Sequence, residues 1–131
     1  WIAILHSGYK GTVLDIAGKT CASLFLKEGT DPSRTWAWIG PGIGKKHYFR
    51  KIGEEWTKEG LVSFFPRNAR IEGKDAFFDL GGEIRLRLLA AGLKEENICS
   101  IPLCTFHNND VCYSYRNGDR ENRLFLLAWL R

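Results

Sequence analysis

Hydrophobic and polar positions follow two different periods along the first quarter of the chain. Residues 2–5 form an apolar run without alternation, which is typical of a strand buried on both faces. From Thr12 to about Lys27 apolar residues recur at steps of three and four, which predicts an amphipathic helix ended by Gly29. The spacing of Thr12 and Asp15 matches a capping box, so the helix is expected to begin at Thr12.

The remainder of the chain predicts short strands and two further helices. Strands are expected at 35–39, 76–78, 98–106, 111–115 and 124–130. Helices are expected near 53–60 and from the N-cap Asp79 to Ala91, and residues 61–74 are ambiguous. About six or seven strands without a strict strand–helix alternation predict an α/β (α+β) fold, a layered arrangement of a mixed β-sheet flanked by helices.

Composition limits the class of protein. A chain of 131 residues with 44% hydrophobic and 26% charged residues fits one domain, 1–131. The net charge of +4 comes from scattered lysines and arginines without a basic block, and most aromatic residues lie in the expected strands, which disfavours nucleic-acid binding. No apolar stretch is long enough for a membrane span and no signal-peptide pattern is present, so we expect no membrane association and a cytoplasmic location.

The first residues indicate that this domain belongs to a longer polypeptide. The chain begins at Trp1, directly before the expected buried strand, and it contains no methionine. A buried strand is a poor place for a natural terminus. We therefore expect residues 1–131 to be the C-terminal part of a longer domain.

The segment 6–12, His-Ser-Gly-Tyr-Lys-Gly-Thr, joins the first strand to the first helix and is the main candidate site. Ligands of open α/β sheets usually bind at the carboxyl ends of strands. Two glycines allow a tight turn and close approach of a ligand, and a helix N-terminus beside Lys10 suits an anion. A plain connecting turn with an exposed histidine has the same spacing, so both interpretations stay open here.

Several motifs in this sequence resemble those of one known family, the YfiH/YlmD-type laccase-domain proteins. Residues 6–12 are similar to its H-A-G-W-R-G-T motif, and residues 37–44 are similar to A-W-I-G-P-x-I-G. Further matches follow in order over the D-L, L-L-x-x-G-V-x-x-E-N-I, L-C-T, F-S-Y-R and G-R motifs, at 79–80, 88–98, 103–105, 113–116 and 122–123. Members of this family are described as multicopper polyphenol oxidases and as purine nucleoside phosphorylases. Because the matches are ordered along most of the chain, the sequence is identified as a member of this family.

The resemblance implies an enzyme that cleaves adenosine or inosine with phosphate, giving the free base and ribose 1-phosphate. It also implies adenosine deamination and copper-dependent oxidation of phenols as related activities. In the family, the histidine at the position of His6 holds zinc or copper together with another histidine and a cysteine from upstream motifs. His6, as catalytic residue and metal ligand, would therefore need the missing N-terminal half of the same protein as a partner.

Three other residues are implied as substrate ligands. Tyr9, in place of the family's tryptophan, offers a ring for a purine, and Lys10, in place of an arginine, offers a cation for phosphate. Lysine lacks the planar fork with which arginine binds phosphate. Arg116 is a candidate for an anionic group, or else a surface arginine paired with Asp119 or Glu121.

The departures from the family pattern keep a second hypothesis open. Besides Lys10, the residues Lys45, Lys46 and His47 replace the family's usual Pro-Cys-Cys. A non-catalytic scaffold that keeps the fold without a complete metal site would also show such changes. His47 is expected to be a solvated loop residue.

The four cysteines allow two interpretations. Cys104, His107 and Cys112 have a C-x-x-H-x4-C spacing that suggests zinc, but a fourth ligand at the usual spacing is missing. Free, buried thiols in a reducing compartment are the other interpretation, and the one that the strand-like surroundings favour.

Overall fold

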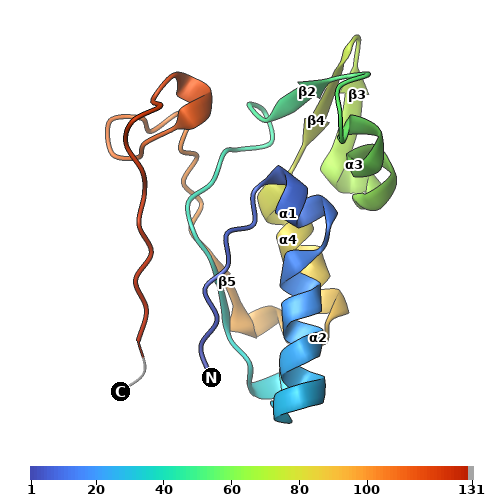
Figure 1. Ribbon diagram of the computed structural model, residues 1–131, viewed down its shortest axis with the longest axis vertical. Helices are drawn as coiled ribbons and strands as arrows, with labels where there is room; N and C mark the ends of the chain where they lie inside the picture. The colour runs from blue at the N-terminus through green and yellow to red at the C-terminus, as the bar shows by residue number, and fades with distance from the viewer. Residues whose placement is uncertain (130–131) are drawn as a thin grey trace.

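The computed structural model describes residues 1–129 of the chain (Figure 1). Its α-helices are α1 (Tyr9–Val13), α2 (Ile16–Glu28), α3 (Thr57–Ser63) and α4 (Leu80–Ala90). Its strands are β1 (Ala37–Ile39), β2 (Phe49–Lys51), β3 (Ala69–Glu72), β4 (Asp75–Phe78) and β5 (Ile98–Ser100). Short 3₁₀ turns occur at Pro32–Arg34, Pro66–Asn68, Glu95–Asn97 and Tyr115–Asn117. This is a mixed α/β fold, as the sequence predicts.

The strands form two small sheets rather than one. In the first, β1 and β5 are parallel, with Ala37 opposite Ile98. In the second, β4 lies between β2 and β3 and is antiparallel to both. Helix α4 contacts α2 and both strands of the first sheet, whereas α3 contacts β3 of the second. In Figure 1, α2 and α4 run side by side below the three-stranded sheet.

Each sheet has its own hydrophobic core. The core beside the three-stranded sheet is built from buried residues of α1, β4 and the chain around β2 and α3: Tyr9, Tyr48, Phe64, Ala76 and Phe78. The core between α2, α4 and β5 is built from Ala17, Cys21, Leu88, Leu93 and Ile98. The corner at residues 6–12 is anchored in the first of these cores through Tyr9.

Helix α4 carries a fully buried carboxylate that links the second sheet to the helices. Glu83 has no exposed surface. Its Oε2 accepts hydrogen bonds from the backbone N–H of Phe65 at 3.0 Å and from Nδ2 of Asn68 at 2.9 Å. Its Oε1 accepts from Nε of Arg87 at 2.9 Å. A buried charge is tolerated only when it is paired and hydrogen-bonded in this way.

The helix ends confirm two of the predicted caps and correct a third. The side chain of Asp79 accepts a hydrogen bond from the N–H of Gly82 and caps α4, and Gly29 ends α2 with a left-handed φ of 64°. The single helix expected from Thr12 is wrong, because the chain forms α1 and α2 with a break at Asp15. The carboxylate of Asp15 caps α2, while the hydroxyl of Thr12 donates within α1 to the carbonyl oxygen of Gly8 at 3.0 Å.

Several predicted strands are also wrong. Residues 2–5 and 124–129 form no strand, and most of their apolar side chains are exposed. Only 98–100 of the expected strand 98–106 pairs as one, and residues 111–115 form no strand. Residue 130, the end of the last predicted strand, lies outside the described residues. Apolar runs predict burial, but a strand needs a partner, and within residues 1–129 none pairs with either terminal segment.

No helix within residues 1–129 combines the length and the hydrophobicity that crossing a membrane requires.

Candidate functional site at residues 6–12

The corner at residues 6–12 brings an exposed histidine next to a short helix. Gly8 precedes α1, and its carbonyl oxygen accepts from the N–H of Thr12 at 2.8 Å. The imidazole of His6 lies over Gly8, so that a Cβ added at this glycine would come within 3.0 Å of His6 Nε2. The absence of a side chain at Gly8 therefore leaves the room in which the His6 ring lies.

Tyr9 points away from this surface and into the core. It is 7% exposed, and its hydroxyl donates to the carbonyl oxygen of Trp56 at 2.9 Å. Its ring stacks on Tyr48 at 5.4 Å and meets the edge of Phe78 at 4.9 Å. Burial raises the pKa of Tyr9 well above its ordinary value, and the nearby Arg50 only partly opposes this. Tyr9 thus anchors the corner in the hydrophobic core.

Lys10 is the cation of the corner that faces solvent. Its side chain is 60% exposed, and Nζ lies 3.7 Å from Oε1 of Glu55 and 5.0 Å from the centre of the Trp56 ring. Exposed pairs of this kind contribute little free energy, about 0–1 kcal/mol. An incoming anion can therefore replace Glu55 as the partner of the Lys10 ammonium group at a small cost in free energy.

Arg116 is connected to the corner through aromatic rings. Its guanidinium lies over the ring of Tyr48 at 4.7 Å, and Nη1 donates to the carbonyl oxygen of Phe49 at 3.3 Å. Tyr48 stacks in turn on Tyr9, whose ring carries the guanidinium of Arg50 at 4.9 Å. Among the described residues Arg116 forms no ion pair with Asp119 or Glu121, the alternative open from the sequence.

The structure therefore connects two arginines to the corner. The motifs place Arg116 in a separate segment, and no motif singles out Arg50. Arg116 is more than a hundred residues away in sequence, and only the fold shows that Tyr48 links it to Tyr9. Arg50 was not singled out, because a lysine- and arginine-rich strand segment is usual for a solvated surface. Only contacts between distant residues could have revealed it.

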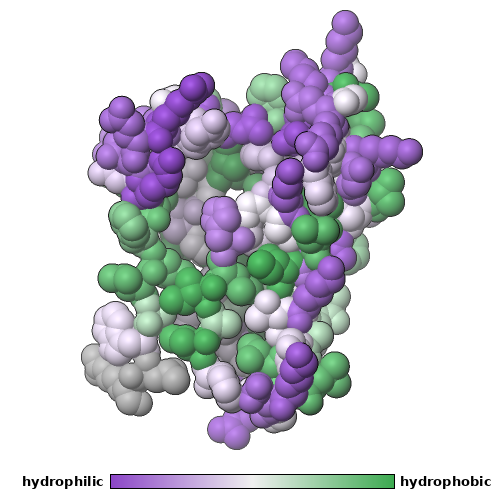
Figure 2. All heavy atoms as spheres, in the orientation of Figure 1, coloured by the Kyte–Doolittle hydropathy of each residue, from purple (hydrophilic) through white to green (hydrophobic). Residues whose placement is uncertain are grey.

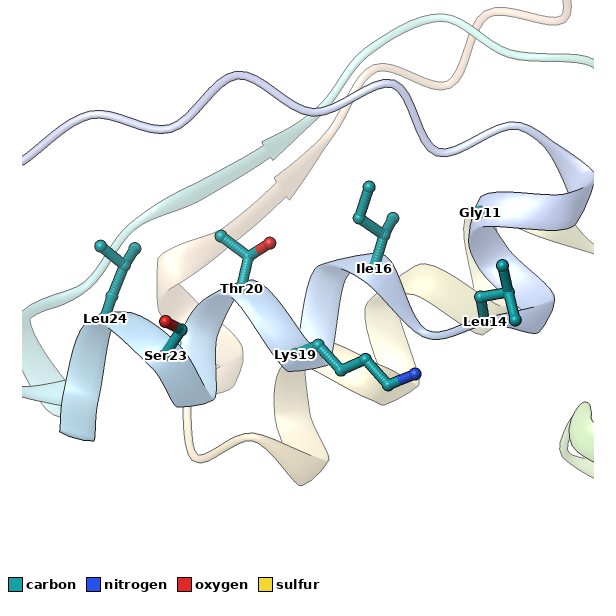
Figure 3. A pocket seen from close by; sticks show the side chains of 7 residues that line it. All are labelled: Gly11, Leu14, Ile16, Lys19, Thr20, Ser23 and Leu24. Atoms are coloured by element: carbon teal, nitrogen blue, oxygen red, sulfur yellow. The ribbon is translucent and has the colours of Figure 1, made fainter. Parts of the chain in front are cut away.

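A shallow groove of about 480 Å³ runs beside the corner (Figure 3). It is lined by Gly11, Leu14 and the face of α2 from Ile16 to Leu24. In Figure 3 the side chains of Ile16, Thr20 and Leu24 point toward the extended N-terminal segment. The groove thus lies along an apolar and hydroxyl-bearing helix face, and its lining does not include His6, Tyr9, Lys10 or Arg116.

At this corner the structure provides one ligand, His6, for the metal that the resemblance implies. Within residues 1–129 no three His, Cys, Asp or Glu side chains lie close enough together to hold an ion. This result also rejects the zinc interpretation of Cys104, His107 and Cys112 within the described chain. A catalytic metal needs about three protein ligands, so His6 alone does not form the site.

A second polar cluster lies where residues 44–47 meet residues 104–107. Nε2 of His47 lies 2.9 Å from Nε2 of His107, although the two residues are 60 positions apart. Loss of solvent lowers the pKa of His47, and the charges of His107 and Lys46 lower it further. Partial burial opposes ionisation of Cys104, but N–H groups of the surrounding loops outweigh it, and the pKa of this thiol is lowered.

Comparison with known proteins assigns the family. The sequence model of the multi-copper polyphenol oxidoreductase laccase family matches residues 1–131. The chain belongs to this family.

Individual relatives carry the name purine nucleoside phosphorylase. One from Xylella fastidiosa is 29% identical over 136 residues, which cover 98% of this chain and 48% of the relative. The purine nucleoside phosphorylase YlmD of Bacillus subtilis is 31% identical over 116 residues, covering 88% of this chain and 42% of the relative.

Solved structures of the family share the fold. YlmD from Geobacillus stearothermophilus superimposes with a TM-score of 0.70 at 27% identity, covering 86% of this chain and 43% of that one. YfiH of Bacillus licheniformis gives a TM-score of 0.73 at 24% identity, with the same coverage. The predicted YfiH-like fold is thus confirmed, and the chain spans about half the length of the relatives that it matches.

Proposed function

We propose that the protein to which this chain belongs is a purine nucleoside phosphorylase acting on adenosine or inosine. The observation that carries this proposal is the similarity, over 98% of the chain, to a relative named for that activity. In the reaction a phosphate oxygen attacks C1′ of the ribose while the N-glycosidic bond breaks. The bond electrons leave with the base, which takes up a proton, and the products are the purine and ribose 1-phosphate.

The chain's own residues would serve the anionic nucleophile. Phosphate needs cations that are exposed and weakly engaged, and Lys10 meets both conditions. Arg116 adds a second cation, a guanidinium, and the stacked pair Tyr9 and Tyr48 fixes the distance between it and the corner. The substrate-binding roles of Tyr9, Lys10 and Arg116 are part of this proposal, with Tyr9 acting from inside the core.

His6 would contribute one ligand to a zinc or copper site completed by the other half of the domain. Its imidazole is exposed at the corner and free of hydrogen bonds to the described residues. The partner that supplies the other ligands is the N-terminal half expected from the sequence.

The surface offers a place for that half. The large apolar side chains Trp1, Trp38, Phe125, Leu127 and Trp129 are all more than 70% exposed. Figure 2 shows hydrophobic side chains gathered over the region of the terminal segments, flanked by hydrophilic ones. Large exposed apolar patches mark surfaces that contact another polypeptide or segment.

The assay that tests the function follows inosine, phosphate and products by chromatography for the full-length protein. Hypoxanthine and ribose 1-phosphate should form in equal amounts, and none should form when phosphate is omitted. Hypoxanthine appearing with free ribose would mean hydrolysis, and no turnover of either nucleoside would favour the second candidate, a non-catalytic scaffold. Lys10, in place of the family's arginine, is the observation that keeps this candidate in view.

Adenosine deamination and copper-dependent oxidation of phenols stay predictions of the resemblance, as does the cytoplasmic location. Each has a direct assay with the same full-length protein: inosine formation from adenosine, coloured product formation from a phenol with added copper, and cell fractionation.

The identity of the cation at position 10 gives a sharper test of the phosphate site. Lys10→Arg is expected to lower the KM for phosphate about fivefold, because a guanidinium binds phosphate through two parallel hydrogen bonds. The KM for inosine should stay within about twofold in the same steady-state measurements. The exposed Lys27→Arg on α2 is the matched control. An unchanged or higher KM for phosphate in Lys10→Arg would place the phosphate elsewhere.

A further inference from the structure

The loops at residues 40–47 and 104–107 are tied together by their backbones. Gly42 and Cys104 form an isolated parallel bridge, and the N–H of Thr105 donates to the carbonyl oxygen of Gly42 at 3.0 Å. The N–H of Gly44 donates to Sγ of Cys104 at 3.1 Å. These contacts place one histidine from each loop, His47 and His107, next to each other.

The two imidazoles are held in a defined orientation. The ring of His47 stacks on Phe106 with centres 4.4 Å apart and planes 10° from parallel. The rings of His47 and His107 are nearly perpendicular, at 85°, with centres 4.1 Å apart and Nε2 atoms 2.9 Å apart. If the two rings were aligned end to end, the distance between their centres would equal the Nε2 separation plus two ring radii. The shorter separation of the centres shows that the two rings meet at an angle, with their Nε2 atoms close together.

We propose that His47 and His107 form a two-histidine binding site for a divalent transition metal of the Cu²⁺ or Ni²⁺ type. Imidazole nitrogens bind such ions at about 2.0–2.1 Å, and two ligands at right angles are then about 2.9 Å apart. This value equals the Nε2 separation in the structure. A tetrahedral ion would require a wider separation of about 3.3 Å, so the geometry favours tetragonal ions over Zn²⁺.

Binding requires a change of tautomer. In the pair as it stands, one Nε2–H donates to the other Nε2, whose lone pair accepts. When the donor ring carries its proton at Nδ1 instead of Nε2, the Nε2 lone pairs of both rings are available to one ion. Water or an added ligand would fill the other positions, because no third protein ligand lies near in residues 1–129. The exposed ammonium groups of Lys45 and Lys46 weaken cation binding, but salt screens them.

The site would act as a clamp between the two loops, and it is separate from the metal implied for His6. It adds a cross-link between segments 60 residues apart, beyond their backbone contacts, the Gly44–Cys104 hydrogen bond and the stacking of His47 on Phe106. It does not depend on the proposed phosphorylase activity, because neither histidine belongs to the ligand set that the resemblance implies.

The test is a calorimetric titration of the full-length protein with NiCl₂, which unlike Cu²⁺ does not oxidise the four thiols. His47→Gln and His107→Gln should each weaken one Ni²⁺ site on the order of 100-fold, because a chelating pair becomes a single ligand. His6→Gln is the matched control, since the chain has three histidines and this one lies outside the pair. It should retain the site, and MgCl₂ should give no binding at it.

A second measurement, the melting temperature, distinguishes loss of the metal site from loss of folding. Ni²⁺ should raise the melting temperature of the wild type and of His6→Gln, but not that of the double variant His47→Gln/His107→Gln. Circular dichroism of the metal-free variants should match the wild type, because both rings lie at the surface. Equal Ni²⁺ affinity in wild type and either single variant, or an equal shift of melting temperature in the double variant, would overturn the proposal.

Discussion

Replacing His6 by alanine in the full-length protein is expected to reduce inosine phosphorolysis at least about 100-fold and to reduce the bound zinc or copper. Loss of a group that merely orients a metal ligand costs about 10- to 100-fold, and loss of a direct ligand should cost no less. Folding should be unaffected, because the His6 side chain is exposed and lies over Gly8. Elemental analysis and steady-state kinetics of the purified variant measure the two effects.

Lys27→Ala provides the control for the preparation, since this lysine lies on the exposed end of α2. It should retain full activity and full metal content. If His6→Ala kept both as well, the assignment of His6 would fail, although the family and the fold would stand. Loss of metal with full activity would show that His6 is a ligand of an ion that phosphorolysis does not need.

Replacing Glu83 by alanine is expected to lower the free energy of unfolding by about 3–5 kcal/mol, because it leaves the partly buried cation of Arg87 and two further donors without their acceptor. The carboxylate is fully buried and binds Phe65, Asn68 and Arg87 at once. Arg87 also donates to the carbonyl oxygen of Ser63, so the change would loosen the end of α3 as well. Urea unfolding at equilibrium measures this loss.

Two further variants separate charge from packing. Glu83→Gln keeps the shape but presents an amide, and it should cost about 1–3 kcal/mol. Glu28→Ala removes an exposed carboxylate at the end of α2 and should change stability by less than about 0.5 kcal/mol. A loss below about 1 kcal/mol for Glu83→Ala would mean that the network is not a main support of the fold.

Local sequence signals predicted the parts of the fold that local chemistry determines. Asp79 caps α4 and Gly29 ends α2 because a capping carboxylate and a left-handed backbone depend on a few neighbouring residues. The break at Asp15 was missed because Thr12 and Asp15 have the spacing of one capping box, whereas Asp15 caps a second helix instead. Spacing alone cannot distinguish these two uses of the same carboxylate.

Strand predictions failed where the partner of the strand decides the structure. Residues 2–5 and 124–129 have apolar runs typical of central strands, yet within the described chain they are unpaired and largely exposed. A sheet needs two strands, and periodicity describes only one of them. We propose that the partners of these segments belong to the other half of the domain.

The candidate site shows the same division between local and distant information. The motif at residues 6–12 located His6 and Lys10 at one exposed corner. It did not show that the Tyr9 ring is buried, nor that Tyr48 connects Arg116 to it, because these contacts join residues far apart in sequence. The His47–His107 pair was missed for the same reason.

We propose that this chain provides one half of a phosphorylase domain. This is tested by phosphate-dependent cleavage of inosine, measured for this chain alone, for the separately expressed N-terminal half, and for the two halves expressed together. Ribose 1-phosphate is expected from the two halves together and none from either alone. Turnover by this chain alone, or the absence of turnover when both halves form a stable complex, would contradict it.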